Sequence, residues 1–185
     1  KHYPYSKVLD FEGRDVDILF IGRVGVAKGI KIIIDLAKNS KYNIYVCGDG
    51  PDMETLKSFD YLENLHITGM LDHKNTMHLL GRAKLLIMPS ICSESFGLSA
   101  AEAVAHGTPI LVSNKGALPE IVSQSKSGHV VSSNSYYEYL RLADEIILNF
   151  ENWNLLHKNA LEFSKKTISK VDNSTSLLSI YESAL

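Results

Sequence analysis

Two carboxylates, Glu94 and Glu102, bracket the segment of this chain best suited to chemistry. A turn containing Gly97 lies between them, after a buried apolar run at 83–90 and before a helical pattern. The first amides of a helix lack internal partners and carry partial positive charge, so they bind anions. Carboxylates repel bare phosphate but accept hydrogen bonds from hydroxyls such as a sugar diol. A turn that offers both groups therefore suits a sugar joined to a diphosphate.

Two cations follow the first predicted strand, which spans 16–22. Arg23 comes directly after the strand-ending Gly22, and Lys28 begins the helical pattern at 28–39. Arginine holds a phosphate through two parallel hydrogen bonds, whereas lysine acts as a point charge. Together they would neutralise a diphosphate and stabilise its departure without a metal. Two solvated surface cations are the alternative, and the position of Arg23 after a strand-ending glycine favours function.

The two carboxylates differ in how well structure alone explains them. Ser99-Ala100-Ala101-Glu102 matches the capping box, in which a glutamate reaches back to the first amide of a helix. Glu102 is equally suited to bind a ribose diol, as acidic residues do in dinucleotide folds, and the pattern leaves both interpretations open. Glu94 lies in a loop, where ordinary solvent exposure is the alternative to a functional role.

Apolar runs alternate with helical patterns along the chain. Strands are predicted at 16–22, 43–47, 65–68, 85–88, 109–112 and 128–131. Helices are predicted at 28–39, after a cap at Asp52, from a cap at Asp72 to about 80, for one turn at 119–122, and at 136–149, 151–164 and 173–185.

This alternation predicts an α/β fold, a Rossmann-like three-layer α/β/α domain with a parallel sheet. Ligands of such sheets bind at the carboxyl ends of the strands, which collects the turns at Gly22, Gly48, Gly50 and Gly69 on one rim. We expect a linker at 1–15, a nucleotide-sugar-binding domain at 16–150, and C-terminal helices at 151–185.

Composition limits the class of protein. The chain has 185 residues, 45% of them hydrophobic, and a formal net charge of −2, so it suits one domain and no nucleic-acid partner. Cys47 and Cys92 show no zinc or disulfide spacing, and no metal site is expected. No run of about 18 apolar residues or signal peptide is visible, so we expect a cytoplasmic protein. The start at Lys1, without a methionine, indicates an excised domain.

Five segments in order resemble the C-terminal, donor-binding half of GT-B retaining glycosyltransferases, the group that includes bacterial glycogen synthases and phosphatidylinositol mannosyltransferases. The resemblance covers roughly 17–131. The segments are Phe20-Ile21-Gly22-Arg23 with Lys28-Gly29, Gly48-Asp49-Gly50-Pro51, Pro89-Ser90 through Glu94 and Phe96-Gly97-Leu98 to Glu102-Ala103, Gly107-Thr108-Pro109, and Gly116-Ala117-Leu118-Pro119-Glu120.

The resemblance implies roles for these residues. Arg23, Lys28 and Glu94 would be catalytic: the two cations would hold the departing diphosphate, and Glu94 would contact the transferred sugar. The donor would be a UDP- or GDP-sugar, transferred with retention and without a required cofactor or metal. Donor-binding positions would be Gly22, Gly48, Gly50, Gly69, Met70, Leu71, Phe96, Gly97, Leu98, Ser99 and Glu102, with the base beside Gly69, Met70 and Leu71.

The resemblance also implies a missing N-terminal domain. That half would carry the contacts to a glycan or lipid-linked acceptor, and it could hold the protein at the cytosolic face of a membrane. The fragment alone would then transfer little sugar. Ser95 and Ala117 stand where the family often has glycine, and Val26-Ala27 replaces a frequent Pro-Glu, which bears on the donor more than on the fold.

Three other functions are weighed against this one. A catalytically inactive partner subunit fits poorly with the retention of Arg23, Lys28, Glu94 and Glu102 together. A nucleotide-sugar 2-epimerase of the same fold lacks support from the spacing of the two glutamates. An ordinary dinucleotide-binding module would carry a glycine-rich fingerprint after the first strand, which 23–28 does not provide.

Overall fold

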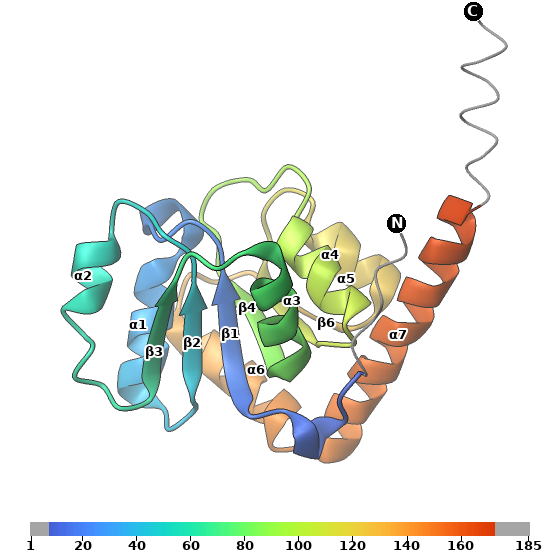
Figure 1. Ribbon diagram of the computed structural model, residues 1–185, viewed down its shortest axis with the longest axis horizontal. Helices are drawn as coiled ribbons and strands as arrows, with labels where there is room; N and C mark the ends of the chain where they lie inside the picture. The colour runs from blue at the N-terminus through green and yellow to red at the C-terminus, as the bar shows by residue number, and fades with distance from the viewer. Residues whose placement is uncertain (1–7, 173–185) are drawn as a thin grey trace, which may run out of the picture.

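The computed structural model describes residues 8–172 and confirms the α/β prediction. Its six strands form one parallel sheet in the order β3-β2-β1-β4-β5-β6 (Figure 1). The strands are β1 (Val16–Ile21), β2 (Ile44–Cys47), β3 (Leu65–Gly69), β4 (Ala83–Met88), β5 (Ile110–Ser113) and β6 (Gly128–Val131).

Seven α-helices and two 3₁₀-helices are described along the same residues. The 3₁₀-helices are η1 (Phe11–Gly13) and η2 (Val26–Lys28). The α-helices are α1 (Ile30–Asn39), α2 (Met53–Lys57), α3 (His73–Arg82), α4 (Leu98–Ala105), α5 (Leu118–Ser125), α6 (Tyr136–Ile147) and α7 (Phe150–Asp172).

The central strands β1, β4 and β5 are largely buried on both faces of the sheet, which explains why they read as nearly continuous apolar runs. In β4, Leu85 and Ile87 join a core cluster with α1 and α6, whereas Leu86 and Met88 join a second cluster with α3, α4 and α5. Figure 1 shows α3, α4 and α5 in front of the sheet and α1 and α6 behind it. The result is the three-layer arrangement predicted from the sequence.

Some helix boundaries and caps differ from the predictions. The helical pattern at 28–39 is divided by Gly29, which adopts a φ of 75° between η2 and α1. Helix α5 has eight residues where one turn was predicted. The predicted cap at Asp72 is confirmed, because its side chain accepts from the Asn75 amide at 2.8 Å. The helix predicted at 173–185 lies outside the described residues.

The predicted cap at Asp52 is wrong. Its side chain makes no cap hydrogen bond to α2. Oδ2 of Asp52 instead accepts from the amide of Val26 at 2.7 Å, in a loop 26 residues earlier. A residue that is typical of helix caps therefore makes a tertiary contact instead, and this contact joins the β1–η2 and β2–α2 loops.

The segment before β1 is anchored by a buried cation, Arg14, which is 2% exposed. Its guanidinium donates to the carbonyls of Ala83 (2.6 Å) and His106 (3.0 Å) and to the hydroxyl of Thr108 (2.7 Å), and it lies 5.3 Å from the ring centroid of Trp153 in α7. Burial lowers the pKa of Arg14 to about 10. These contacts tie the segment to the amino end of the sheet and to α7.

Within residues 8–172, every helix is too short or too polar to span a lipid bilayer.

Candidate functional site

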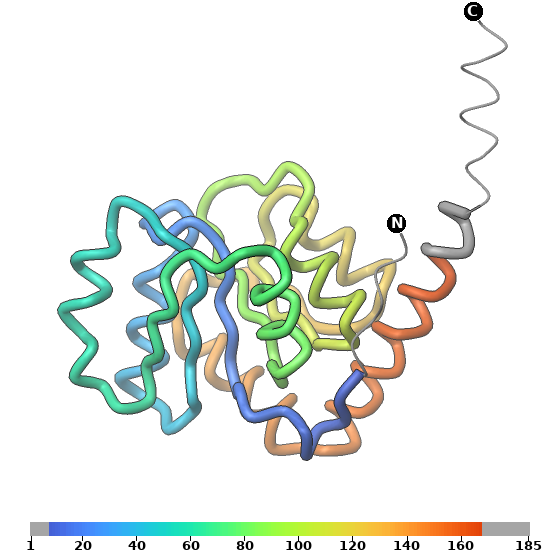
Figure 2. Tube along the Cα trace, viewed as in Figure 1, coloured from blue at the N-terminus to red at the C-terminus, as the bar shows by residue number. Residues whose placement is uncertain are grey.

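The strand order creates a crevice between β1 and β4. These strands pair in the sheet, yet the helices that follow them, α1 and α4, pack on opposite faces. The two loops therefore diverge at the carboxyl end of the sheet, where doubly wound folds bind ligands. Figure 2 shows the loops after β1, β2 and β4 gathered along the upper edge.

Two hollows lie on this rim, on either side of Gly22 and Arg23. The β1/β4 hollow measures about 350 Å³, and Lys28, Ser90, Glu94 and the segment from Phe96 to Ser99 also line it. The β1/β2 hollow measures about 780 Å³, and Gly48, Asp49, Gly50, Met70 and Leu71 contribute to its walls.

Lys28 and Glu94 meet in the β1/β4 hollow. The Nζ of Lys28 lies 2.6 Å from Oε1 of Glu94, although the residues are 66 positions apart. Packing of the loop around η2 on the β4–α4 loop explains the approach. A Cβ on Gly29 would lie only 2.0 Å from the Pro89 carbonyl oxygen, and the Ile91 amide donates to the Ala27 carbonyl at 2.9 Å.

Glu94 is held on several sides. Oε1 also accepts from the hydroxyl of Ser90 at 2.5 Å, and the amide of Ala117 donates to the Glu94 carbonyl at 2.8 Å. Burial raises the pKa of the Glu94 carboxyl, but the hydrogen bonds from Lys28 and Ser90 outweigh it and hold that pKa below its usual range. The side chain therefore enters the site as an ordered anion.

Ser90 is a site residue to which the sequence interpretation assigned no role. Ser90 lies two residues after the end of β4 and is 2% exposed, and its hydroxyl donates to Glu94. The only sequence signal was its place in the Pro89-Ser90 segment of the glutamate motif. Nothing in that pattern specifies which side chain the hydroxyl contacts.

The amino end of α4 faces the β1/β4 hollow. Helix α4 begins at Leu98 after Gly97, which has a φ of 62°, and no side chain caps it. The first bond within the helix runs from the amide of Ala101 to the carbonyl of Gly97. The preceding amides, at Leu98, Ser99 and Ala100, are the groups that bind anions at helix starts.

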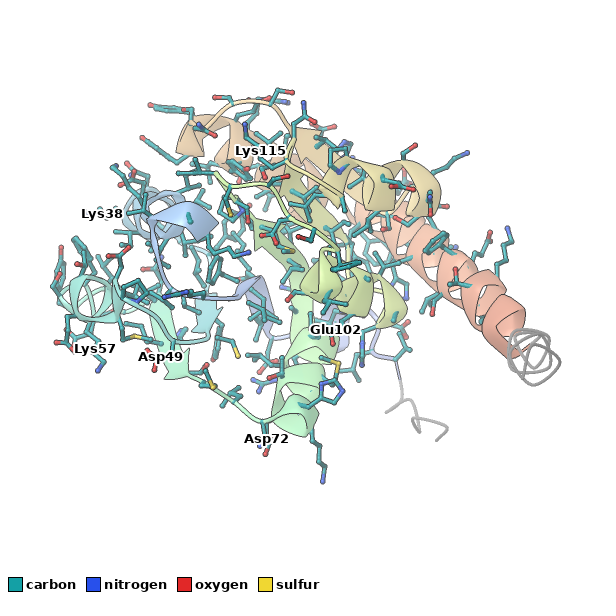
Figure 3. The ribbon with its side chains drawn as sticks, turned by 90° about the horizontal axis from the view of Figure 1, so that it is seen from above. Lys38, Asp49, Lys57, Asp72, Glu102 and Lys115 are labelled. Atoms are coloured by element: carbon teal, nitrogen blue, oxygen red, sulfur yellow. The ribbon has the colours of Figure 1, made fainter. Side chains whose placement is uncertain are left out.

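The capping-box interpretation of Glu102 is wrong. Because α4 begins at Leu98, Ser99 lies inside the first turn and cannot act as the cap residue. Within the described residues, the carboxylate of Glu102 makes no hydrogen bond and lines neither hollow. Figure 3 shows Glu102 on α4 in the view down onto the rim. Its half-exposed side chain remains available to a ligand that extends beyond the β1/β4 hollow.

Arg23 is the cation shared by both hollows. Its side chain is exposed and makes no ion pair within the described part of the chain. The loop that carries it packs against the next one, since a Cβ on Gly48 would lie 1.9 Å from the Gly22 carbonyl oxygen. The amide of Val24 donates to the carbonyl of Asp49 at 2.9 Å. These contacts fix the backbone beside which Arg23 projects.

The proposed base-binding residues lie at the far wall of the β1/β2 hollow. Met70 and Leu71 line it, and the side chain of Met70 is 77% exposed. Gly69 ends β3 with a φ of 68° but does not line the hollow. Asp49 also lines it, and the sequence interpretation gave that residue no role. Figure 3 places Asp49 on this side of the rim.

The structure thus brings most of the predicted residues to one rim and leaves two outside the hollows. Within residues 8–172 there is no group of three or more histidine, cysteine or acidic side chains that could hold a metal ion. Of the predicted site residues, those that line the hollows are Gly22, Arg23, Lys28, Gly48, Gly50, Met70, Leu71, Glu94, Phe96, Gly97, Leu98 and Ser99; Gly69 and Glu102 do not.

A parallel sheet with helices on both faces and a hollow at its switch point defines a Rossmann-like domain. The chain belongs to the family of glycosyl transferases group 1, whose model matches residues 4–163. Its fold is that of the C-terminal domain of GT-B glycosyltransferases.

Comparison with individual proteins agrees with this assignment. An uncharacterized glycosyltransferase of Methanocaldococcus jannaschii is 31% identical over 151 residues, which cover 80% of this chain and 43% of that protein. Sucrose-phosphate synthase of Thermosynechococcus elongatus superposes with a TM-score of 0.77 at 22% identity, covering 92% of this chain and 46% of the other. Anabaena HepE in complex with UDP and glucose gives a TM-score of 0.75 at 17% identity, covering 91% and 49%.

The chain spans about half the length, or less, of the curated relatives that it matches.

Proposed function

We propose that the rim binds a nucleoside-diphosphate sugar and that the chain is the donor half of a retaining glycosyltransferase for hexoses. The observation that carries the proposal is the composition of the β1/β4 hollow. Two cations, Arg23 and Lys28, and the amino end of α4 face an ordered carboxylate, Glu94, across one cavity. This combination has a group for each part of a sugar diphosphate.

Each group has a proposed role. Arg23 and Lys28 bind the diphosphate and stabilise the negative charge that it gains as the bond to the sugar breaks. The amides from Phe96 to Ser99 add partial positive charge beside it. Glu94 accepts hydrogen bonds from sugar hydroxyls.

The nucleoside extends along the larger hollow. We propose that the backbone around Gly69, Met70 and Leu71 lines the base, with Gly48 and Gly50 allowing close approach. Glu102 accepts the ribose hydroxyls; loss of the capping-box explanation removes the competing interpretation. The complexes of HepE with UDP and glucose and with UDP-glucose support a nucleotide-sugar donor. UDP and GDP are both retained as donor nucleotides.

The remaining parts of the activity are proposed from the family. A second, N-terminal domain carries the contacts to a glycan or lipid-linked acceptor and makes any contact with the cytosolic face of a membrane. The donor half alone then binds the nucleotide sugar weakly and transfers little or none. We propose that the protein acts in the cytoplasm, because its proposed donors are nucleotide sugars.

The test is calorimetric titration of the 185-residue chain with UDP, GDP, ADP and their common sugar conjugates, with NAD as a control. We expect one nucleotide series to bind and Arg23→Ala to abolish that binding. The matched control is Arg141→Ala, which removes an exposed arginine paired with Glu145 on α6, at 3.3 Å, outside both hollows. Silence across the panel that is confirmed with the full-length protein, or equal loss in both variants, contradicts the proposal and favours an inactive partner subunit.

A further inference from the structure

The ion pair between Lys28 and Glu94 occupies the place where a diphosphate would bind. Its atoms lie 2.6 Å apart, and the side chains are only 29% and 11% exposed. A diphosphate in the β1/β4 hollow meets the repulsion of the carboxylate and competes with it for the lysine. The repulsion from Glu94 therefore weakens the binding of an anion in this hollow. The same ion pair in open solvent would weaken it less, because water screens the charges.

Ser90 holds Glu94 in position when Lys28 binds a phosphate instead of the carboxylate. Its hydroxyl donates to the same oxygen, Oε1, at 2.5 Å and is fixed by burial. Glu94 then retains one donor and its position. Oε2 has no hydrogen-bond partner within the described residues, so it is the acceptor open to a ligand, since an ionised carboxylate accepts on both oxygens.

A bare diphosphate and a diphosphate sugar differ at this point. The bare diphosphate binds Lys28 in place of Glu94, and its negative charge repels the carboxylate of Glu94. The sugar conjugate supplies hydroxyl donors that replace the lysine on the carboxylate. Selectivity of this kind comes from an element that disfavours the wrong ligand as much as from one that attracts the right ligand.

We infer that the Lys28–Glu94 pair makes the site select a nucleoside diphosphate that carries a sugar over the bare nucleoside diphosphate. The inference rests on the proposed function and concerns the discrimination within it. Glu94 lowers the affinity for the spent nucleotide, which favours its release after transfer. Ser90 is the positioning residue that keeps Glu94 aimed at the sugar once Lys28 has moved.

The test compares two pairs of ligands, UDP with UDP-glucose and GDP with GDP-mannose, titrated calorimetrically into the native chain and Glu94→Gln. Glutamine keeps the shape but neither repels phosphate nor holds Lys28 as an ion pair. We expect the bare diphosphate to bind about 1.5- to fivefold more tightly, from the range of measured ion-pair strengths. We expect the sugar conjugate to bind no more tightly than before, so that the selectivity is lost.

Three further variants make the test specific. Lys28→Met should weaken both ligands of a pair, because it removes the phosphate contact itself. Ser90→Ala should weaken the conjugate and leave the bare diphosphate unchanged. The control Glu145→Gln removes an exposed carboxylate on α6 that pairs with Arg141, and it should change neither affinity. Circular dichroism verifies folding, and Glu94→Ala replaces Glu94→Gln if the latter does not fold.

The inference and the proposed function fail differently. If neither the native chain nor the full-length protein binds any of the four ligands, both are overturned. If it binds them but Glu94→Gln weakens the bare diphosphate or leaves it unchanged, only the inference is overturned. Weakening of both ligands to the same extent in Ser90→Ala would overturn the positioning role of Ser90.

Discussion

A glycine behind the site gives the sharpest structural prediction. Gly116, in the β5–α5 loop, has a φ of 59°, and a Cβ there would lie 2.1 Å from the carbonyl oxygen and 2.5 Å from the nitrogen of Glu94. Gly116→Ala therefore adds left-handed backbone strain, about 1–2 kcal/mol. It also moves Glu94 and the hydrogen bond from Ala117, worth about 1 kcal/mol. We expect the free energy of unfolding to fall by about 2–3 kcal/mol.

Substitutions at Gly69 and Gly81 distinguish the cost of backbone strain from the cost of a steric clash. Gly69 has a similar φ, 68°, but no atom lies within 4 Å of its Cβ position, so Gly69→Ala should cost only the strain, about 1–2 kcal/mol. Gly81 lies in α3, also with open space around it. Gly81→Ala should stabilise the chain by about 0.5–1 kcal/mol, because glycine is unfavourable within a helix.

Urea denaturation measures the free energy of unfolding of all three variants, compared at the same dependence of that free energy on urea concentration. The expected order of stability is Gly81→Ala, native chain, Gly69→Ala, Gly116→Ala. Calorimetry should also show weaker binding of the sugar conjugate to Gly116→Ala, since Glu94 is displaced. A Gly116→Ala variant as stable as Gly69→Ala, with unchanged binding, would refute the claim that the β5–α5 loop positions Glu94.

Three further predictions concern the anchor before β1 and the two carboxylates. Arg14→Met leaves buried acceptors without donors, and urea denaturation should show a loss of about 3 kcal/mol or more; a loss below about 1 kcal/mol would contradict its anchoring role. Glu102→Ala should leave the melting temperature unchanged, because Glu102 is not a cap, and should weaken nucleotide binding in calorimetry; the reverse result would restore the capping role. The depressed pKa of Glu94 means that its ionised form stabilises the fold above the unfolded pKa, about 4.3, and that this contribution is lost as pH falls through the lower folded pKa. Melting temperatures from pH 7 to pH 3 should therefore fall less steeply for Glu94→Gln than for the native chain, and parallel curves would count against the hydrogen-bonded carboxylate.

The sequence was sufficient to predict where the strands lie and that the turns after them meet at one edge of the sheet. The central strands are short, mostly apolar runs, and burial on both faces of a parallel sheet makes such runs visible without any partner. The cap at Asp72 was also predictable, because its acceptor and the amide of Asn75 lie three residues apart. Alternation of strands and helices then placed the turns on one edge.

Contacts between distant loops could not be predicted from local patterns. Asp52 resembles a helix cap but accepts a hydrogen bond from the amide of Val26. The capping box at Ser99 fails because Gly97 is the cap residue of α4, two residues before the position that the pattern predicts. The strand order sets which loops touch, and it alone brings Lys28 to Glu94. Residue types predict a chemistry for the site, whereas the pairing of those residues is a property of the tertiary fold.

The central claim is that the β1/β4 hollow binds the diphosphate of a nucleotide sugar. An isotope-edited NMR titration of the 185-residue chain with UDP-glucose and GDP-mannose tests it most directly. If the diphosphate binds in this hollow, the largest amide shifts occur at Gly22, Arg23 and the segment from Gly97 to Ser99, with smaller shifts at Met70. Shifts confined to other parts of the chain, or none with either ligand, would contradict the account.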